Sequence, residues 1–150
     1  LKTLNAAMAL RGAETGTFTT IDLCVFDPAT EEAAFYKYGA APSYLKKGGA
    51  VRRVTGGSLP AGLRGNPAPP DVTRTRLEPG SFVVMVSDGV TGGDSEDWLR
   101  GLLSGWQGGD SQELAQMILA ESRRHGGLRD DCAALVLRLE KSEETLEKRV

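Results

Sequence analysis

The sequence predicts an α+β fold in which antiparallel strands and helices occupy separate stretches of the chain. In the first half, strand-like segments follow one another through short turns, a pattern typical of antiparallel sheets. Helical periodicity appears at the start of the chain and again between residues 94 and 125. Two runs, residues 81–86 and 132–139, are apolar at nearly every position, which indicates central strands covered on both faces.

The chain begins with a helical stripe over residues 1–11, and Gly12 is expected to end that helix. Residues 17–27 and 32–38 are strand-like and are separated by a short turn, so they should pair as a hairpin. Asp22 is the unusual residue of the first strand. A lone Asp in a strand is more often at an edge or hydrogen-bonded to a neighbouring loop than catalytic, so a structural role is expected.

The middle of the chain reads as short strands and one long loop. Residues 43–47 and 50–54 flank a double-glycine turn and should continue the antiparallel meander. Residues 56–71 are rich in Gly and Pro and have no period, so they should form a loop. Residues 72–77 alternate as a strand that places two arginines on a solvated face.

Two helices are expected after the first apolar run, over residues 94–103 and 112–125. Asp110 should cap the second helix, because an Asp side chain accepts hydrogen bonds from the free N–H groups at a helix start. Residues 140–150 are charged and should form a frayed helical tail, which leaves residues 1–139 as the folded domain.

Composition narrows the possible classes of function. The net charge of −2 and the absence of a cluster of Lys and Arg interleaved with aromatic residues argue against a nucleic-acid surface. These residues contain no apolar run long enough to span a bilayer, and we expect no signal peptide among them. Cys24 and Cys132 both fall inside expected strands, which favours buried free thiols in a reducing compartment over a disulfide. His125 is the only histidine, which excludes a multi-histidine metal site.

The most informative stretch is the end of the first apolar run, where the strand stops at Asp88-Gly89. Gly89 allows the backbone to turn sharply or to approach a ligand closely. A carboxylate at the end of a buried strand suits a hard cation such as Mg²⁺ or Mn²⁺. An Asp-Gly pair is also a common turn signal, so Asp88 could instead cap the helix that follows.

A second acidic pair, Asp130-Asp131, directly precedes the second apolar run. If the two runs are neighbouring antiparallel strands, the end of one lies beside the start of the other, and Asp88 meets Asp130 at one edge of the sheet. Adjacent carboxylates repel unless a proton or a cation lies between them, and a hydrated divalent cation would remove that repulsion. The alternative is that Asp130 and Asp131 only form the turn before the strand.

Six short motifs occur in an order that resembles a known family. They are Phe18-Thr-Thr-Ile-Asp-Leu, Tyr38-Gly-Ala-Ala-Pro-Ser-Tyr-Leu, Ser58-Leu-Pro-Ala-Gly-Leu, Leu77-Glu-Pro-Gly-Ser-Phe, Val86-Ser-Asp-Gly-Val and Arg129-Asp-Asp-Cys-Ala. The pattern resembles the sporulation stage II protein E (SpoIIE) type phosphatases, which belong to the PPM (metal-dependent, type 2C) protein serine/threonine phosphatases. The resemblance covers nearly the whole chain up to about Leu139.

The resemblance implies an antiparallel β-sandwich flanked by helices (αββα), with a two-metal site for Mn²⁺ or Mg²⁺ at one end. In this family, metal-activated water attacks the phosphorus of a phosphoserine or phosphothreonine without a phosphoenzyme. Asp88 matches the metal aspartate of the family's Ser-Asp-Gly motif, and Gly89 matches the glycine next to it. Asp130 matches the metal aspartate of the late acidic pair, and Asp131 occupies the second position of that pair.

Two departures from the family pattern bear on the site. The late motif, often Asp-Asp-Met-Thr, is here Asp130-Asp131-Cys132-Ala133, which keeps both carboxylates. The early Asp-Gly-Met-Gly segment, which carries the aspartate that bridges both metals, is missing. Leu1 lies inside a helical stripe and is not Met, so we expect that segment upstream. The chain would then be a C-terminal portion of the domain, incomplete at its N-terminus, with half of the metal site.

The sequence therefore predicts a bacterial metal-dependent protein serine/threonine phosphatase that acts on a phosphoprotein, with a phosphorylated anti-sigma-factor antagonist as the expected substrate. The expected location is the cytoplasm, either free or as the cytoplasmic domain of a membrane-anchored protein. The rival hypothesis is a truncated or degenerate module that binds a protein partner without hydrolysis. An Asp-Gly pair after a strand upstream of Leu1 would favour the enzyme.

Overall fold

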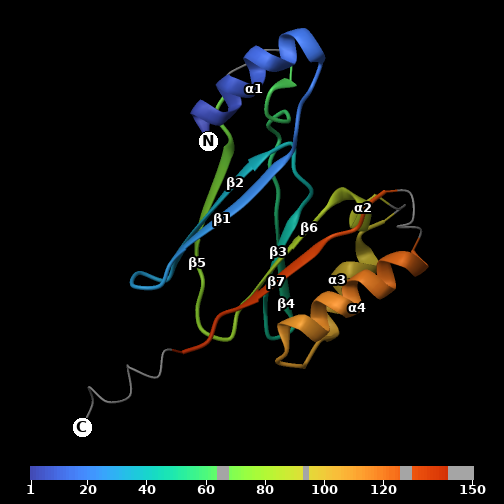
Figure 1. The fold of residues 1–150 in the computed structure, drawn as a ribbon. Coiled ribbons are helices and arrows are strands. Elements are labelled where there is room, and N and C mark those ends of the chain that lie inside the picture. Colours follow the sequence, from blue (N-terminus) through green and yellow to red (C-terminus); the bar gives the residue numbers. More distant parts are fainter. Residues whose placement is uncertain (64–67, 93–94, 126–129, 142–150) are drawn as a thin grey trace. The chain divides into compact units, whose positions relative to one another are not determined.

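The computed structural model describes residues 1–63, 68–92, 95–125 and 130–141, with the backbone alone at residues 12–15 (Figure 1). Its helices and strands are α1 (Lys2–Thr15), β1 (Ile21–Asp27), β2 (Glu32–Tyr38), β3 (Ser43–Lys47), β4 (Ala50–Val54), β5 (Asp71–Arg76), β6 (Phe82–Val86), α2 (Asp88–Thr91), α3 (Asp97–Gly105), α4 (Ser111–Arg124) and β7 (Ala134–Arg138). The expected α+β class is confirmed, because both sheets contain antiparallel pairs and helices accompany them.

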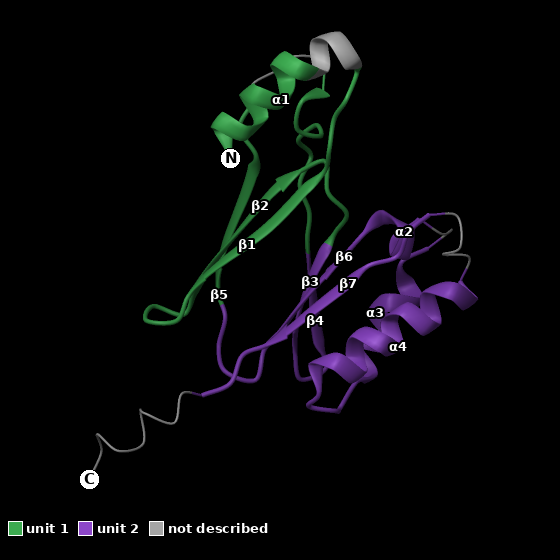
Figure 2. Cartoon of the chain, viewed as in Figure 1, with its two compact units in different colours: residues 1–42, 54–76 green, residues 43–53, 77–150 purple. Residues whose placement is uncertain are grey.

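The elements form two compact units, one of residues 1–42 and 54–76 and the other of residues 43–53 and 77–150 (Figure 2). The first unit holds a three-stranded sheet of order β1-β2-β5, and the second a four-stranded sheet of order β4-β3-β6-β7. The expected neighbours β3 and β4 are confirmed, but they do not continue the sheet of β1 and β2, because β2 and β3 follow each other in sequence and lie in different sheets. The chain leaves β2 through Gly39, which has a φ of 57° that side chains disfavour.

In the first unit, the expected hairpin of β1 and β2 is confirmed, with Cys24 opposite Phe35. Phe35 and Lys37 of β2 are fully buried. The Lys37 ammonium pairs with the Asp22 carboxylate at 2.7 Å and donates to the Ala41 carbonyl oxygen at 2.7 Å. Asp22 thus has the structural role that its place inside a strand suggested.

Helix α1 does not end at Gly12, as expected, but continues to Thr15. An interior glycine costs a helix only about 1 kcal/mol relative to alanine, so one glycine does not stop it. Gly16, which follows the last residue, has a φ of 68°, the left-handed conformation that commonly ends helices.

In the second unit, α3 and α4 pack on one face of the four-stranded sheet, as predicted. The residues of this core that are buried are Tyr44, Phe82, Val84, Val86, Val90, Leu99, Leu103, Leu114 and Ile118. Tyr44, Val84 and Val136 lie side by side across β3, β6 and β7, so they present one face to the helices. The helix α4 begins at the expected cap, since the Asp110 carboxylate accepts from the N–H groups of Gln112 at 2.7 Å and Glu113 at 3.1 Å.

The two apolar runs are neighbouring antiparallel strands, as predicted, but only β6 is central. Within the described residues β7 is the edge strand of its sheet, so the expectation that this run forms a central strand is wrong. Ala134 and Val136 pack toward the helices, whereas Leu135 and Leu137 are 58% and 44% exposed. A continuous apolar run is compatible with a central strand and with an edge strand, because the sequence pattern does not indicate how many neighbouring strands a strand has.

Parts of the expected tail and helix boundaries lie outside the described residues. Residues 142–150 of the charged tail are among these, and so are residues 93 and 94, before α3. In the stretches that the structure describes, every helix is too short or too polar to cross a membrane.

Candidate functional site

Asp88 lies at the surface, two residues after the end of the buried strand β6. Four of the five residues of β6 are buried, and Ser87 after them is extended, with φ −77° and ψ 163°. Asp88 is the first residue of α2 and is exposed, whereas Gly89 and Val90 behind it are buried. In the described part of the chain, the Asp88 carboxylate contacts no hydrogen-bond donor or cation, so it is open to a ligand.

The second acidic pair lies at the same end of the sheet as Asp88. Strands β6 and β7 are antiparallel with Val86 opposite Ala134, so β7 begins where β6 ends. The N–H of Ser87 donates to the carbonyl oxygen of Ala133 at 3.0 Å, which extends the ladder by one residue beyond β7. Asp130 therefore lies at the same end of this sheet as Asp88, and the predicted approach of their two carboxylates stays a prediction.

Gly89 allows the two acidic turns to touch. A Cβ atom at Gly89 would overlap the carbonyl oxygen of Asp131 and lie 3.2 Å from that of Asp130. Those atoms are backbone, so they cannot swing away as a side chain would. The contact requires the absence of a side chain, and any larger residue would separate the turns.

Ser87 and Cys132, to which the sequence assigned no role in the site, connect the turns. The Ser87 hydroxyl donates to the carbonyl oxygen of Asp131 at 3.0 Å and accepts from the N–H of Ala133 at 2.9 Å. The Cys132 thiol donates to the carbonyl oxygen of Gly89 at 3.2 Å. Cys132 was expected inside a strand but precedes β7, on the turn itself. Both cysteines are free thiols, as expected, but each is half-buried and not buried as the sequence predicted.

The donor chemistry of the two turns fits part of a site for a hard cation. Asp88, Asp130 and Asp131 are exposed carboxylates on adjoining turns, and carboxylate oxygens are the ligands that Mg²⁺ and Mn²⁺ prefer. The Asp130 carboxylate also accepts from the N–H of Asp131 at 2.8 Å, which restrains its turn. Among the described residues, however, no three His, Cys, Asp or Glu side chains group closely enough to hold an ion. The turns would therefore need donors from elsewhere.

His125 and Tyr44 have packing roles in the second unit. The His125 ring, at the end of α4, stacks on Trp98 with centroids 5.1 Å apart. The Tyr44 hydroxyl donates to the Glu96 carboxylate at 2.8 Å, and Arg53 also contacts that carboxylate at 2.9 Å. Burial and the hydrogen bond to Glu96 raise the pKa of Tyr44, so its hydroxyl stays protonated.

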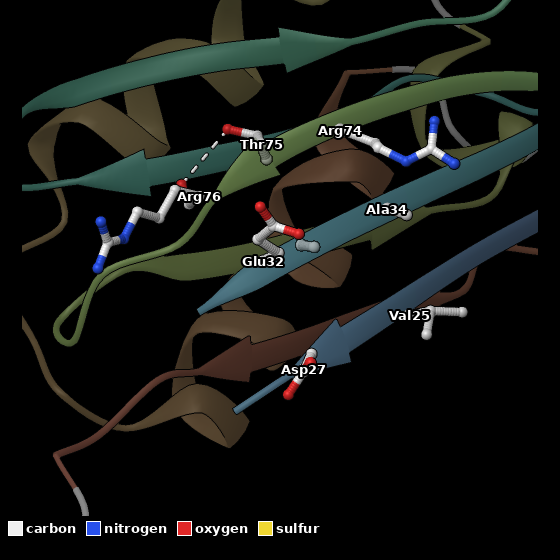
Figure 3. Close-up of a pocket in the computed structure, with 8 residues that line it drawn as sticks. Val25, Asp27, Glu32, Ala34, Arg74, Thr75 and Arg76 are labelled. Atoms are coloured by element: carbon white, nitrogen blue, oxygen red, sulfur yellow. Dashed lines mark hydrogen bonds between the residues drawn. The ribbon is translucent and has the colours of Figure 1, made fainter. Parts of the chain in front are cut away.

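A separate pocket of about 350 Å³ lies on the sheet of the first unit (Figure 3). Its charged lining residues include Asp27, Glu32, Arg74 and Arg76. Arg74 and Arg76 are exposed, as the strand pattern predicted. The pocket contains none of the residues that the sequence predicts to bind metal, so it adds no ligand to the candidate metal site.

Comparisons with known proteins show the family to which this chain is similar. The family model of stage II sporulation protein E (SpoIIE) matches residues 1–140. The stage II sporulation protein E of Bacillus subtilis (strain 168) is 30% identical over 147 residues, which cover 93% of this chain and 18% of that protein. The chain thus spans less than a fifth of the length of this curated relative.

Solved structures show the same fold. The manganese-presoaked phosphatase domain of SpoIIE from Bacillus subtilis matches with a TM-score of 0.74 and 28% identity, covering 94% of this chain and 65% of that one. The catalytic domain of the serine threonine protein phosphatase PstP, in complex with two manganese ions, matches with a TM-score of 0.74. At 19% identity over 91% of this chain and 67% of that one, the second match is a likeness of fold.

Proposed function

Because this chain belongs to the stage II sporulation protein E (SpoIIE) family, we propose that it forms part of a metal-dependent protein serine/threonine phosphatase domain. The observation that carries the proposal is the contact between two acidic turns at one end of β6 and β7. Asp88-Gly89 leaves one strand, Asp130-Asp131 enters the other, and no side chain separates Gly89 from the second turn. The match to a solved phosphatase domain over 94% of the chain supports it.

In this proposal, Asp88 and Asp130 bind Mn²⁺ or Mg²⁺ through their carboxylates, with Asp131 beside them. A bound divalent cation would supply hydroxide at neutral pH and offset negative charge on the phosphoryl oxygens. The residues of this chain would hold the cation and orient the carboxylates that bind it. Gly89 keeps the turns in contact, and the exposure of the carboxylates leaves room for a phosphorylated side chain of another protein.

Counting ligands suggests that this chain alone holds an incomplete site. Two-metal sites keep their ions about 3.5–4 Å apart through shared ligands. Within the described residues no group of three suitable side chains is present, and we therefore expect a shared ligand from outside these residues. The resemblance assigns that role to an upstream aspartate. A cation bound by two carboxylates and water should be held weakly.

Activity of two forms of the protein tests this proposal. The 150 residues in isolation should hydrolyse an aryl phosphate no faster with Mn²⁺ than the same chain carrying Asp88→Asn. The natural protein that contains these residues, with its upstream segment, should be active with Mn²⁺. In that longer form, Asp88→Asn or Asp130→Asn should abolish turnover across all Mn²⁺ concentrations.

A matched control separates the site from a general effect of charge. Asp97 is an exposed aspartate in the first turn of α3, so Asp97→Asn makes the same chemical change away from the acidic turns. It should leave turnover unchanged. Full activity after Asp88→Asn would remove Asp88 from the chemistry and make Asp88-Gly89 only a turn. Asp88-dependent turnover by the isolated 150 residues would mean that a carboxylate here, such as Asp131, replaces the upstream ligand.

The expected substrate is a phosphorylated anti-sigma-factor antagonist, and the expected location is the cytoplasm. Exposed carboxylates on surface turns suit a phosphate presented by a folded protein more than one that must enter a deep cleft. The test is release of phosphate from such a phosphoprotein compared with a phosphoserine peptide of the same local sequence. Equal rates for the two substrates would show that the folded partner is not recognised.

The rival function is a binding module without catalysis. It is favoured by the incomplete donor set of the described residues. A module of this kind would bind a phosphoprotein with the same affinity before and after Asp88→Asn and would never release phosphate. The phosphatase hypothesis predicts release that depends on both Mn²⁺ and Asp88.

A further inference from the structure

Ser87 makes three hydrogen bonds to the segment that leads into β7, two of them through its side chain. Its N–H donates to the Ala133 carbonyl oxygen at 3.0 Å. Its hydroxyl donates to the Asp131 carbonyl oxygen at 3.0 Å and accepts from the Ala133 N–H at 2.9 Å. A hydroxyl has one proton to donate and lone pairs to accept, so both side-chain bonds form together. They span Cys132 and fix the backbone on either side of it.

The location of Ser87 makes these bonds unexpected. Ser87 is the residue before α2, where a serine hydroxyl usually accepts a hydrogen bond from the first N–H groups of the helix. Here the side chain makes no such capping bond. The hydroxyl is instead used to hold the entry of β7, so helix capping does not explain it.

Cys132 also connects the same two turns. Its thiol donates to the carbonyl oxygen of Gly89 at 3.2 Å. Its sulfur also lies 3.7 Å from the hydroxyl of Ser122, a buried residue of α4. The thiol therefore connects the turn before β7 to the turn after β6 and to the helix behind them.

The two residues are neighbours of the acidic residues but supply no carboxylate themselves. Ser87 precedes Asp88, and Cys132 follows Asp131. An aspartate side chain is short, so the separation of two carboxylates is set mainly by the separation of their backbones. Contacts that fix the two backbones therefore fix the distance over which a cation is shared.

We propose that Ser87 is a positioning residue that, together with Cys132, sets the spacing between the Asp88 turn and the Asp130–Asp131 turn. The proposal rests on the proposed function, because it concerns how tightly those carboxylates hold a divalent cation. It adds the hydroxyl and the thiol as groups that act through the backbone and do not touch the ion or the substrate.

The test is to measure the Mn²⁺ affinity of the natural protein that contains these residues. The signal of free Mn²⁺ in electron paramagnetic resonance is the readout. Loss of a group that orients metal ligands typically weakens affinity about 10–100-fold, and Ser87→Ala should fall in that range. Ser87→Thr keeps the hydroxyl, so this variant should bind Mn²⁺ much more tightly than Ser87→Ala and nearly as tightly as the unaltered protein. Cys132→Ala should weaken binding by a smaller factor, because a thiol is a weaker donor.

Ser104→Ala is the matched control. The Ser104 hydroxyl donates to the Gly49 carbonyl oxygen at 2.8 Å, so the change also removes a serine-to-backbone hydrogen bond from the same unit. It should leave Mn²⁺ affinity unchanged. Thermal unfolding without metal measures how far each variant is destabilised, and Ser87→Ala should differ from Ser104→Ala in affinity far more than in melting temperature.

The outcomes separate this inference from the function on which it rests. If Asp88→Asn leaves Mn²⁺ binding intact, the proposed metal site is wrong. If Asp88→Asn abolishes binding but Ser87→Ala binds as tightly as the unaltered protein, only the positioning role is overturned. Should Ser87→Ala fail to fold, Cys132→Ala decides: weaker binding supports the role, and unchanged binding overturns it.

Discussion

Gly89 lies against the carbonyl group of Asp131 so closely that a Cβ atom at Gly89 would overlap its oxygen. Gly89→Ala should therefore force the two acidic turns apart. Overpacking a tight contact costs typically about 1–3 kcal/mol, and here backbone must move, so we expect a loss of unfolding free energy in that range. Urea unfolding measures it, and Mn²⁺ affinity should fall as well.

Gly101→Ala is the control for that substitution. Gly101 is an exposed residue inside α3, and a Cβ there meets no atom within 4 Å. Alanine in a helix interior is favoured over glycine by about 0.5–1 kcal/mol, so this variant should be more stable than the unaltered protein. Equal effects of the two substitutions would show that the contact at Gly89 does not matter.

Breaking the ion pair between Asp22 and Lys37 should destabilise the first unit. Lys37 is 1% exposed, so Asp22→Asn leaves a buried ammonium without its carboxylate. Losing one partner of a buried pair costs about 3–5 kcal/mol, and we expect about 3 because Asp22 is partly exposed. The double variant Asp22→Asn, Lys37→Met should lose less than the sum of the single variants. Additive effects in chemical denaturation would contradict the pairing.

Tyr44→Phe removes a hydroxyl but keeps a buried ring. The lost hydrogen bond goes to the Glu96 carboxylate, and bonds to charged groups contribute about 1.5–3 kcal/mol. We expect a destabilisation in that range by thermal or urea unfolding. The control is Tyr36→Phe, because the Tyr36 hydroxyl forms no hydrogen bond to the residues that the structure describes, and it should change stability little.

The same hydroxyl predicts a pH dependence. Burial, followed by the bond to Glu96, raises the pKa of Tyr44 above its ordinary value of 10.0. A raised acid pKa stabilises the fold fully below the unfolded pKa, and that stabilisation is lost as pH rises above about 10. The unaltered protein should therefore lose more stability than Tyr44→Phe between pH 9 and 11. Parallel curves for the two proteins would contradict this.

Asp110→Ala should loosen the start of α4. The Asp110 carboxylate accepts from two N–H groups there, and losing such a cap costs about 1 kcal/mol. Asp110→Asn keeps an acceptor, so its stability should lie within a few tenths of a kcal/mol of that of the unaltered protein. Helix content by circular dichroism and the melting temperature measure the difference between the two variants.

Local patterns in the sequence were sufficient for much of the fold. The apolar run before Asp88 predicted a central strand, because a strand that is apolar on both faces has to be covered on both, and β6 is such a strand. The cap at Asp110 and the hairpin of β1 and β2 also depend on residues close together in the chain. Local sequence also predicted that Asp88 follows β6 and that Asp130 and Asp131 precede β7.

Other features were decided only by contacts between distant parts of the chain. The change of sheet between β2 and β3 depends on which strands pair, and neighbours in sequence do not record it. β7 carries the same apolar run as a central strand, yet it lies at the sheet edge within the described residues.

The hydrogen bonds that link the two acidic turns belong to the tertiary structure alone. Ser87 and Asp131 are 44 residues apart, and nothing in the composition around either residue indicates a hydrogen bond between them. The sequence by itself determined which carboxylates stand at the ends of the two strands. The pairing of β6 with β7 decided that Ser87, Gly89 and Cys132 hold those ends together, because a hydrogen bond requires two groups within about 3 Å of each other.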